Sequence, residues 1–136
     1  MRVWETHGVK SFENLEVWQI GRDLVTKVYM LTVNLPQSET FGLIAQIKRA
    51  ALSVPANIAE RFGRYHYMDN MDKAKFYLNA RGSLYELKSH LLIAQDLGYL
   101  KQSQALPDIL TLIDNLSVKL NNLIATTRKL KNEESQ

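Results

Sequence analysis

The chain has 136 residues, of which 46% are hydrophobic and 23% are charged, and this balance is typical of one folded domain and excludes a disordered polyelectrolyte. It contains no cysteine, which excludes disulfide bonds, thiolate metal ligands and a cysteine nucleophile. There is no signal-peptide pattern and no apolar stretch of about 18 residues, so we expect a cytoplasmic protein that does not enter a membrane.

The net charge of +3 is unevenly distributed along the chain. Residues 48–88 hold eight basic and four acidic side chains, whereas residues 1–47 hold four basic and five acidic ones, and residues 89–136 hold five of each. The whole positive excess therefore lies in the central third, which directs the search for a binding surface to that segment.

Two amphipathic helices are predicted in the first half. Apolar residues at intervals of three and four predict a helix from about Glu13 to Asn34, which stops before Pro36. A second helix is expected to begin at a cap formed by Ser38 or Thr40 and to end near Gly63. Its expected apolar face comprises Phe41, Ile44, Ile47, Ala51, Val54, Ile58 and Phe62. Pro55 in its interior predicts a kink.

The second half predicts two longer helices. The third begins at the candidate N-cap Asp69 and stops at Gly98. The fourth begins at the candidate cap Ser103, with Pro107 tolerated in its first turn. Its apolar register is Ile109, Ile113, Leu116, Leu120, Leu123, Thr127 and Leu130.

The connections between these helices are too short to cross a bundle from end to end, so consecutive helices must run antiparallel. We therefore predict an all-α, up-and-down antiparallel four-helix bundle over residues 13–131. It follows an N-terminal arm at residues 1–12 and precedes a frayed tail at residues 132–136.

No motif for catalysis or for a cofactor is found. Glu86 and His90 are four residues apart, and this single pair predicts a surface salt bridge better than a metal site. His66 with Asp69 and Asp72 is a weaker group in a turn, where polar side chains are expected for solvation alone. We therefore expect no catalytic residue, no metal and no cofactor, and hence a protein that is not an enzyme.

Polar residues of the second and third helices form stripes opposite their apolar faces, and Pro55 and Gly82 predict a close helix crossing. One interpretation is a hydrogen-bond network between helices or subunits, formed by Asn57, Glu60, Ser83 and Glu86. The other is an outward-facing nucleic-acid-binding surface, formed by Arg49, Arg61, Arg64, Arg81 and Lys88, with Tyr65 and Tyr67 for base stacking. The two interpretations are compatible.

Three segments in order resemble a known family: "SFENLEVWQIGRDLV" at 11–25, "QIKRAALSVPANIAERFGR" at 46–64 and "FYLNARGSLYELKSHLLIAQDLGYL" at 76–100. They resemble the bacterial four-helix-bundle proteins encoded by intervening sequences of 23S ribosomal RNA genes, and the resemblance covers about residues 11–127. It implies a homopentamer related to the accessory protein of diversity-generating retroelements, which looks to engage nucleic acid and a reverse transcriptase. The positions matching the family motif are Asn57, Glu60, Gly63, Arg64, Gly82, Ser83 and Glu86.

Arg61 departs from the family, which usually has "NIAEG" where this chain has "NIAER". The sequence supports two functional hypotheses. The first is a non-catalytic, oligomeric nucleic-acid-binding protein, with RNA favoured over DNA, that uses the basic surface of the second and third helices. The second is a protein-interaction scaffold that recruits a partner such as a nucleic-acid enzyme.

Overall fold

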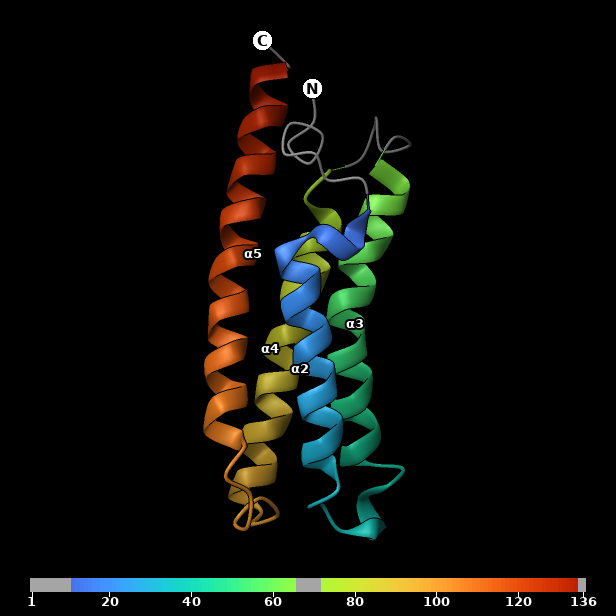
Figure 1. The fold of residues 1–136 in the computed structure, drawn as a ribbon, viewed down its shortest axis with the longest axis vertical. Helices are drawn as coiled ribbons and strands as arrows, with labels where there is room; N and C mark the ends of the chain where they lie inside the picture. The colour runs from blue at the N-terminus through green and yellow to red at the C-terminus, as the bar shows by residue number, and fades with distance from the viewer. Residues whose placement is uncertain (1–10, 66–71, 135–136) are drawn as a thin grey trace.

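The computed structural model describes residues 11–65 and 72–134, with side chains through Leu130. The described ranges contain helices and no strand: η1 (Phe12–Asn14), α2 (Glu16–Thr32), η2 (Gln37–Glu39), α3 (Leu43–Arg64), α4 (Lys75–Asp96) and α5 (Leu106–Glu134). Consecutive long helices run antiparallel (Figure 1), and each contacts its two neighbours in the cycle α2–α3–α4–α5–α2. The predicted up-and-down four-helix bundle is confirmed.

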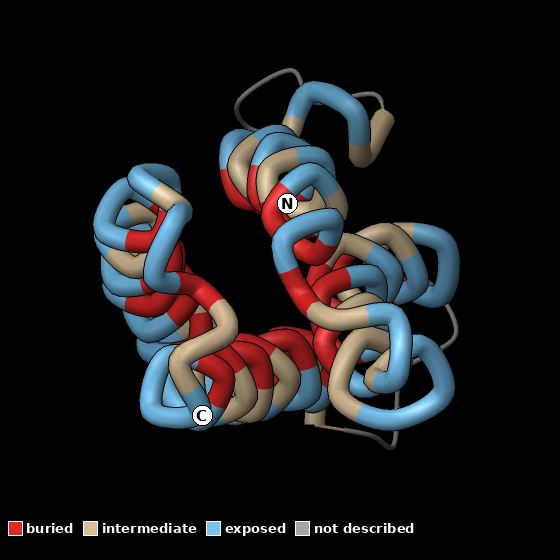
Figure 2. The backbone as a smooth tube through the Cα atoms, turned by 90° about the horizontal axis from the view of Figure 1, so that it is seen from below, coloured by how far each residue is buried: buried red, intermediate tan, exposed pale blue. Residues whose placement is uncertain are grey.

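The core lies along the common axis of the four helices. Buried residues line the inward side of each helix (Figure 2), because apolar residues spaced by three and four fall on one helical face. The predicted register of the last helix is confirmed for Ile109, Ile113, Leu116 and Leu120, which have no exposed surface. Farther along the helix, Ile124 is buried, whereas the predicted Leu123, Thr127 and Leu130 are only partly buried. None of the described helices carries an apolar stretch able to span a bilayer.

The helix starts differ from the predicted ones. α2 begins at Glu16 after a short 3-10 turn, and α3 begins only at Leu43, after Gly42. The predicted caps Ser38 and Thr40 are wrong, because the Leu43 amide donates to the carboxylate of Glu39 at 3.0 Å instead. Phe41 consequently lies before the helix with 96% of its surface exposed, so its predicted place in the core is also wrong.

The later helix ends follow local chemistry more closely. α4 begins at Lys75, and the Ala74 amide before it donates to Asp72 at 2.9 Å, while the candidate cap Asp69 lies outside the described residues. Gly98 stops α4 with a φ of 82°, a conformation that glycine adopts without strain. The Ala105 amide donates to Ser103 just before α5, and Pro107 lies in the first turn of that helix.

α3 runs without interruption through Pro55, so the bend expected there stays a prediction. Pro55 packs against α2, where a Cβ added to Gly21 would be 3.4 Å from the proline Cβ. The predicted boundary of the bundle at residue 131 falls inside α5, which is helical to Glu134. Residues 1–10, most of the predicted N-terminal arm, lie outside the described residues.

Candidate nucleic-acid interface

The polar stripes of α3 and α4 meet along the seam between these two helices, which pack against each other more extensively than any other pair in the bundle. The hydroxyls of Ser53 and Ser83 lie 2.8 Å apart across the seam. The Asn57 amide donates to the Ser53 hydroxyl at 3.1 Å and to the Ser53 carbonyl at 2.8 Å. The two hydroxyls therefore link α3 to α4, and Asn57 supports Ser53 from within α3.

One turn from this serine pair, Arg49 of α3 forms an ion pair with Glu86 of α4. Gln46 also accepts from Arg49, at 3.1 Å from Nε and 2.9 Å from Nη2. His90 lies one turn beyond Glu86, with its Nε2 3.5 Å from the same carboxylate oxygen. The predicted pairing of Glu86 with His90 is therefore one part of a cluster of four side chains, defined here as the Arg49 cluster: Gln46, Arg49, Glu86 and His90.

Glu60 does not join the contact between α3 and α4. Its carboxylate is 3.1 Å from Arg64 of the same helix, and both side chains are largely exposed. Of the four residues predicted to form an inter-helix network, Ser83 and Glu86 make contacts across the α3–α4 seam, Asn57 connects to it through Ser53, and Glu60 points to solvent.

Arg81 and Lys88 lie on the other side of α4, against α5. Arg81 donates to Asn121 at 2.8 Å, and Lys88 pairs with Asp114 at 2.9 Å. The cations that were predicted to form one surface are thus divided: Arg49 lies at the α3–α4 seam, Arg64 is exposed on α3, and Arg81 and Lys88 lie against α5.

Arg61 does not face outward, and its predicted place on the exposed surface is wrong. Only 6% of its surface is exposed, and its guanidinium donates to the Lys73 carbonyl at 2.8 Å and to the Tyr77 hydroxyl at 3.2 Å. The rings of Tyr65 and Tyr77 lie 4.9 Å and 4.2 Å from it. Because a buried charge needs such partners, Arg61 joins the end of α3 to the beginning of α4.

The same contacts remove Tyr65 from the proposed base-stacking surface. Its ring is 8% exposed and is covered by Arg61 and by the Lys73 ammonium at 5.1 Å. Tyr67, the other predicted stacking residue, lies outside the described residues. Burial raises the pKa of Tyr77 above its ordinary value, and the positive charge of Arg61 partly opposes this shift.

The two glycines expected near the interface have open surroundings within the chain. A Cβ added to Gly63 or Gly82 would have no atom within 4 Å among those of the described neighbours. The close approach predicted at Gly82 is therefore not made inside the bundle. The close crossing instead involves Gly21 of α2 against Pro55, which the sequence did not predict because a single helical glycine carries no signal of its partner.

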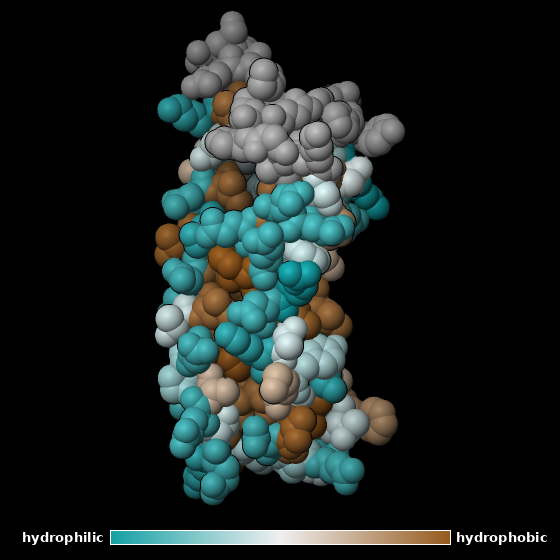
Figure 3. Space-filling view, viewed as in Figure 1, coloured by the Kyte–Doolittle hydropathy of each residue, from teal (hydrophilic) through white to brown (hydrophobic). Residues whose placement is uncertain are grey.

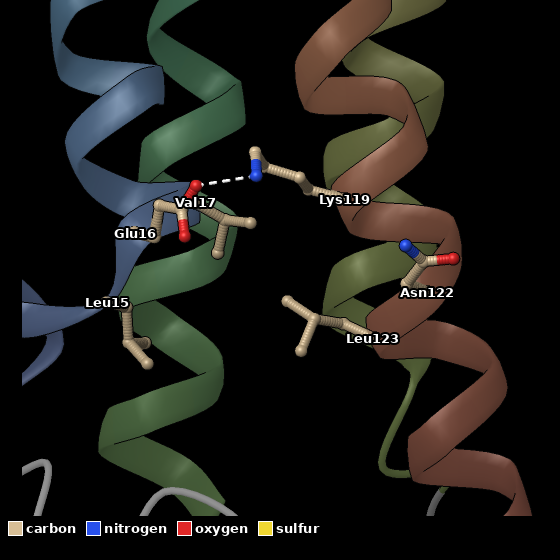
Figure 4. A pocket seen from close by; sticks show the side chains of 6 residues that line it. All are labelled: Leu15, Glu16, Val17, Lys119, Asn122 and Leu123. Atoms are coloured by element: carbon tan, nitrogen blue, oxygen red, sulfur yellow. Dashed lines mark ion pairs between the residues drawn. The ribbon is translucent and has the colours of Figure 1, made fainter. Parts of the chain in front are cut away.

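The seam between α2 and α5 is less completely filled. Apolar surface is visible along it (Figure 3), and two pockets of about 250 Å³ and 210 Å³ lie at its ends. In the larger one, Lys119 and Leu123 extend from α5 toward α2 (Figure 4), and Lys119 pairs with Glu16 at 2.6 Å. Lys27 pairs with Asp108 at 3.6 Å in the other. We call this surface the α2–α5 groove.

The acidic residues considered for a metal site are only partly described. Asp72 contacts Arg128 at 3.4 Å, whereas His66 and Asp69 lie outside the described residues. Among the residues that the structure describes, no three histidine, aspartate or glutamate side chains come together in a way that could hold a metal ion.

Comparison with known protein families gives one match, to the family described as 23S rRNA-intervening sequence protein, over residues 13–122. The resemblance that the three sequence segments indicated is confirmed. A comparison with curated proteins found no match.

Proposed function

The chain belongs to the 23S rRNA-intervening sequence protein family, and on that premise we propose that it is a non-catalytic, RNA-binding protein of the bacterial cytoplasm. In this proposal, exposed cations of α3 and α4 contact the phosphates of the RNA. The observation that carries the proposal is the location of the positive excess on one pair of adjacent helices.

The four helices differ in charge. α3 and α4 together carry seven basic and three acidic side chains, whereas α2 carries two of each and α5 carries four of each. A polyanion is attracted to the side of a protein where positive charge accumulates. The α3–α4 side of the bundle therefore favours an RNA ligand over the α2–α5 side.

Arg49 and Arg64 already form ion pairs with carboxylates of the same chain, and these ion pairs do not prevent the two arginines from binding phosphates. Arg49 and Arg64 are 55% and 65% exposed, and their carboxylate partners are also exposed to solvent. Exposed ion pairs of this kind contribute about 0–1 kcal/mol, so a phosphate can replace the carboxylate at little cost. Arg61 is excluded from the proposed RNA contacts because it is buried.

A single copy with three or four phosphate contacts binds RNA weakly, and an assembly of several copies would strengthen binding by avidity. The homopentamer expected from the family resemblance is part of this proposal. Light scattering of the purified protein tests it, since a pentamer has five times the mass of the 15.6 kDa chain. A monomer at micromolar concentration would contradict the assembly.

Fluorescence anisotropy with a labelled RNA hairpin tests the RNA-binding proposal. The variant Arg49→Gln/Arg64→Gln/Arg81→Gln should lower the slope of log affinity against log salt concentration by about 0.7–0.9 for each phosphate that the protein no longer neutralises. The matched control Arg22→Gln/Lys27→Gln/Lys119→Gln neutralises cations of α2 and α5 and should leave the slope unchanged. The proposal fails if the wild type does not bind at low salt, or if the slope falls equally in both variants.

A scaffold that recruits a nucleic-acid enzyme is the second candidate, and the α2–α5 groove favours it. A surface with exposed apolar side chains and little net charge is suited to a protein partner rather than to a polyanion. The triple-glutamine variant of α3 and α4 separates the two candidates. Under the scaffold hypothesis it still co-purifies with a partner enzyme, whereas under the RNA hypothesis it no longer binds its ligand.

A further inference from the structure

The imidazole of His90 is the least satisfied polar group in the Arg49 cluster. Its Nε2 is inaccessible to solvent and makes no hydrogen bond within the described chain. The nearest oppositely charged atom is Oε1 of Glu86, at 3.5 Å, one turn earlier on α4. A buried polar atom normally has a hydrogen-bond partner, and Oε1 of Glu86 is close enough to become the partner of this nitrogen after a small movement.

The carboxylate beside His90 is already in use. The same Oε1 of Glu86 accepts from Nη2 of Arg49, and Gln46 holds the guanidinium from its other side. One carboxylate oxygen therefore lies between a guanidinium from α3 and an imidazole from α4. A proton on His90 would make both neighbours of this oxygen cationic.

Lys88, two residues before His90, has its partner on another helix. On the side that packs against α5, Lys88 is paired with Asp114 at 2.9 Å. Among the described residues, α2 is not packed beside α4 as a neighbouring helix. The charged groups that face His90 are thus Glu86 from its own helix and, through that carboxylate, Arg49 from α3.

We propose that His90 controls the availability of Arg49 to a phosphate ligand in response to pH. With a neutral imidazole, Glu86 neutralises Arg49. Histidine is the side chain that most often acts as a proton-driven switch in proteins, and a proton on His90 allows its Nε2 to donate to Glu86 in a charge-assisted hydrogen bond. The net charge of the cluster then rises from zero to +1, which weakens the neutralisation of Arg49 by Glu86 and attracts a phosphate oxygen to Arg49.

This inference rests on the proposed RNA-binding function. It adds that the protonation of His90 affects how Arg49 of α3 contacts the RNA. It predicts that mild acid strengthens RNA binding through the one positive charge that the Arg49 cluster gains. The slope of log affinity against log salt should therefore be steeper at pH 5.5 than at pH 7.5 by about 0.7–0.9.

The first measurement is RNA anisotropy for the wild type and for His90→Gln at both pH values. We expect the wild-type slope to steepen in acid and the His90→Gln slope to stay constant. The matched variant His66→Gln should behave as the wild type. The inference is overturned if His90→Gln retains the full pH dependence or if the wild type has none.

The second measurement needs no RNA. The ¹H–¹⁵N signal of the Arg49 Nε–H in the free protein should shift between pH 7.5 and 5.5 together with the His90 imidazole signals, and it should not shift in His90→Gln. A constant Arg49 signal in the wild type overturns the inference. If Arg49 responds but no RNA binds at either pH, the coupling of the two side chains stands and the proposed function fails.

Discussion

Arg61 shows how the surroundings of one side chain determine whether a cation binds a ligand or holds the fold together. Its neighbour Arg64 is three residues away, carries the same charge and is 65% exposed. Arg61 is instead enclosed by two tyrosine rings and donates to the backbone at Lys73. A guanidinium is suited to this position because its flat faces stack on aromatic rings while its edge donates hydrogen bonds.

Replacement of Arg61 by alanine should therefore destabilise the bundle by about 2–3 kcal/mol, because it removes two hydrogen bonds and the ring contacts of a buried guanidinium and leaves the partly buried Lys73 carbonyl without this donor. Urea unfolding followed by circular dichroism measures this. The matched variant Arg64→Ala should change the free energy of unfolding by less than about 0.5 kcal/mol. Equal destabilisation of the two variants would contradict the buried position of Arg61.

Tyr77 gives a prediction about alkaline pH. Burial raises its pKa in the folded protein above the ordinary value of 10.0, so the unfolded chain releases the phenol proton first. Stability from this group is complete below pH 10.0 and falls as pH rises through the folded pKa. The free energy of unfolding should decrease less steeply above about pH 10 in Tyr77→Phe than in the wild type. Parallel curves for the two proteins would rule out this contribution.

At the level of the helix, two glycines in similar positions have different surroundings. Gly21 faces Pro55 where α2 and α3 cross, whereas Gly82 on α4 faces open space within the described chain. A glycine within a helix costs about 0.5–1 kcal/mol relative to alanine, because its backbone loses more conformational freedom on folding. At Gly21 the crossing compensates for part of this cost. Within the described chain, no contact does so at Gly82.

Gly82→Ala should accordingly stabilise the bundle by about 0.5–1 kcal/mol, since the added methyl group meets no atom within 4 Å in the described chain. Gly21→Leu should instead destabilise it by more than about 2 kcal/mol, since a large side chain cannot fit against Pro55. Thermal unfolding distinguishes the two signs. If Gly82→Ala is destabilising under conditions in which the protein is oligomeric, another subunit occupies the space beside Gly82.

In the whole molecule, α3 and α4 form the most extensive helix pair. The C-terminal part of α5 has the least packing against other helices. Among the side chains of α5 that the structure describes, which end at Leu130, Ile124 is the last buried one, although the helix continues to Glu134. Its contact with α2 has pockets at both ends, each with an exposed ion pair that links the two helices. Local stability follows the amount of buried apolar contact, so the four helices should differ in how readily they open.

Hydrogen exchange should reflect this difference. The amides of α3 and α4 near Ser53 and Ser83 should be the most protected, and those of α5 after Ile124 should exchange fastest among the four long helices. Mass spectrometry of peptides from a deuterium-exchange time course resolves these regions. Equal protection of residues 125–134 and of the middle of α5 would show that another copy or another segment covers this end.

The sequence predicted much of the fold because local rules govern those features. The three- and four-residue spacing of apolar side chains determined the four helices, and short connections determined their antiparallel order. Gly98 ended α4 through its own backbone freedom. Ser38 and Thr40 failed as predicted caps because the chain offered another acceptor, the Glu39 carboxylate, and the choice between them depends on the path of the connection.

The candidate interface depended on information that no local pattern contains. The sequence by itself determined that the positive excess lies in residues 48–88 and that these residues form the second and third long helices. Only the tertiary structure decided that Arg61 is buried beneath two tyrosines, that Arg81 and Lys88 face α5, and that Arg49 and His90 share Glu86. The physical reason is that helical periodicity determines which residues share a face, whereas burial and ion pairing depend on the side chains that a neighbouring helix brings opposite them.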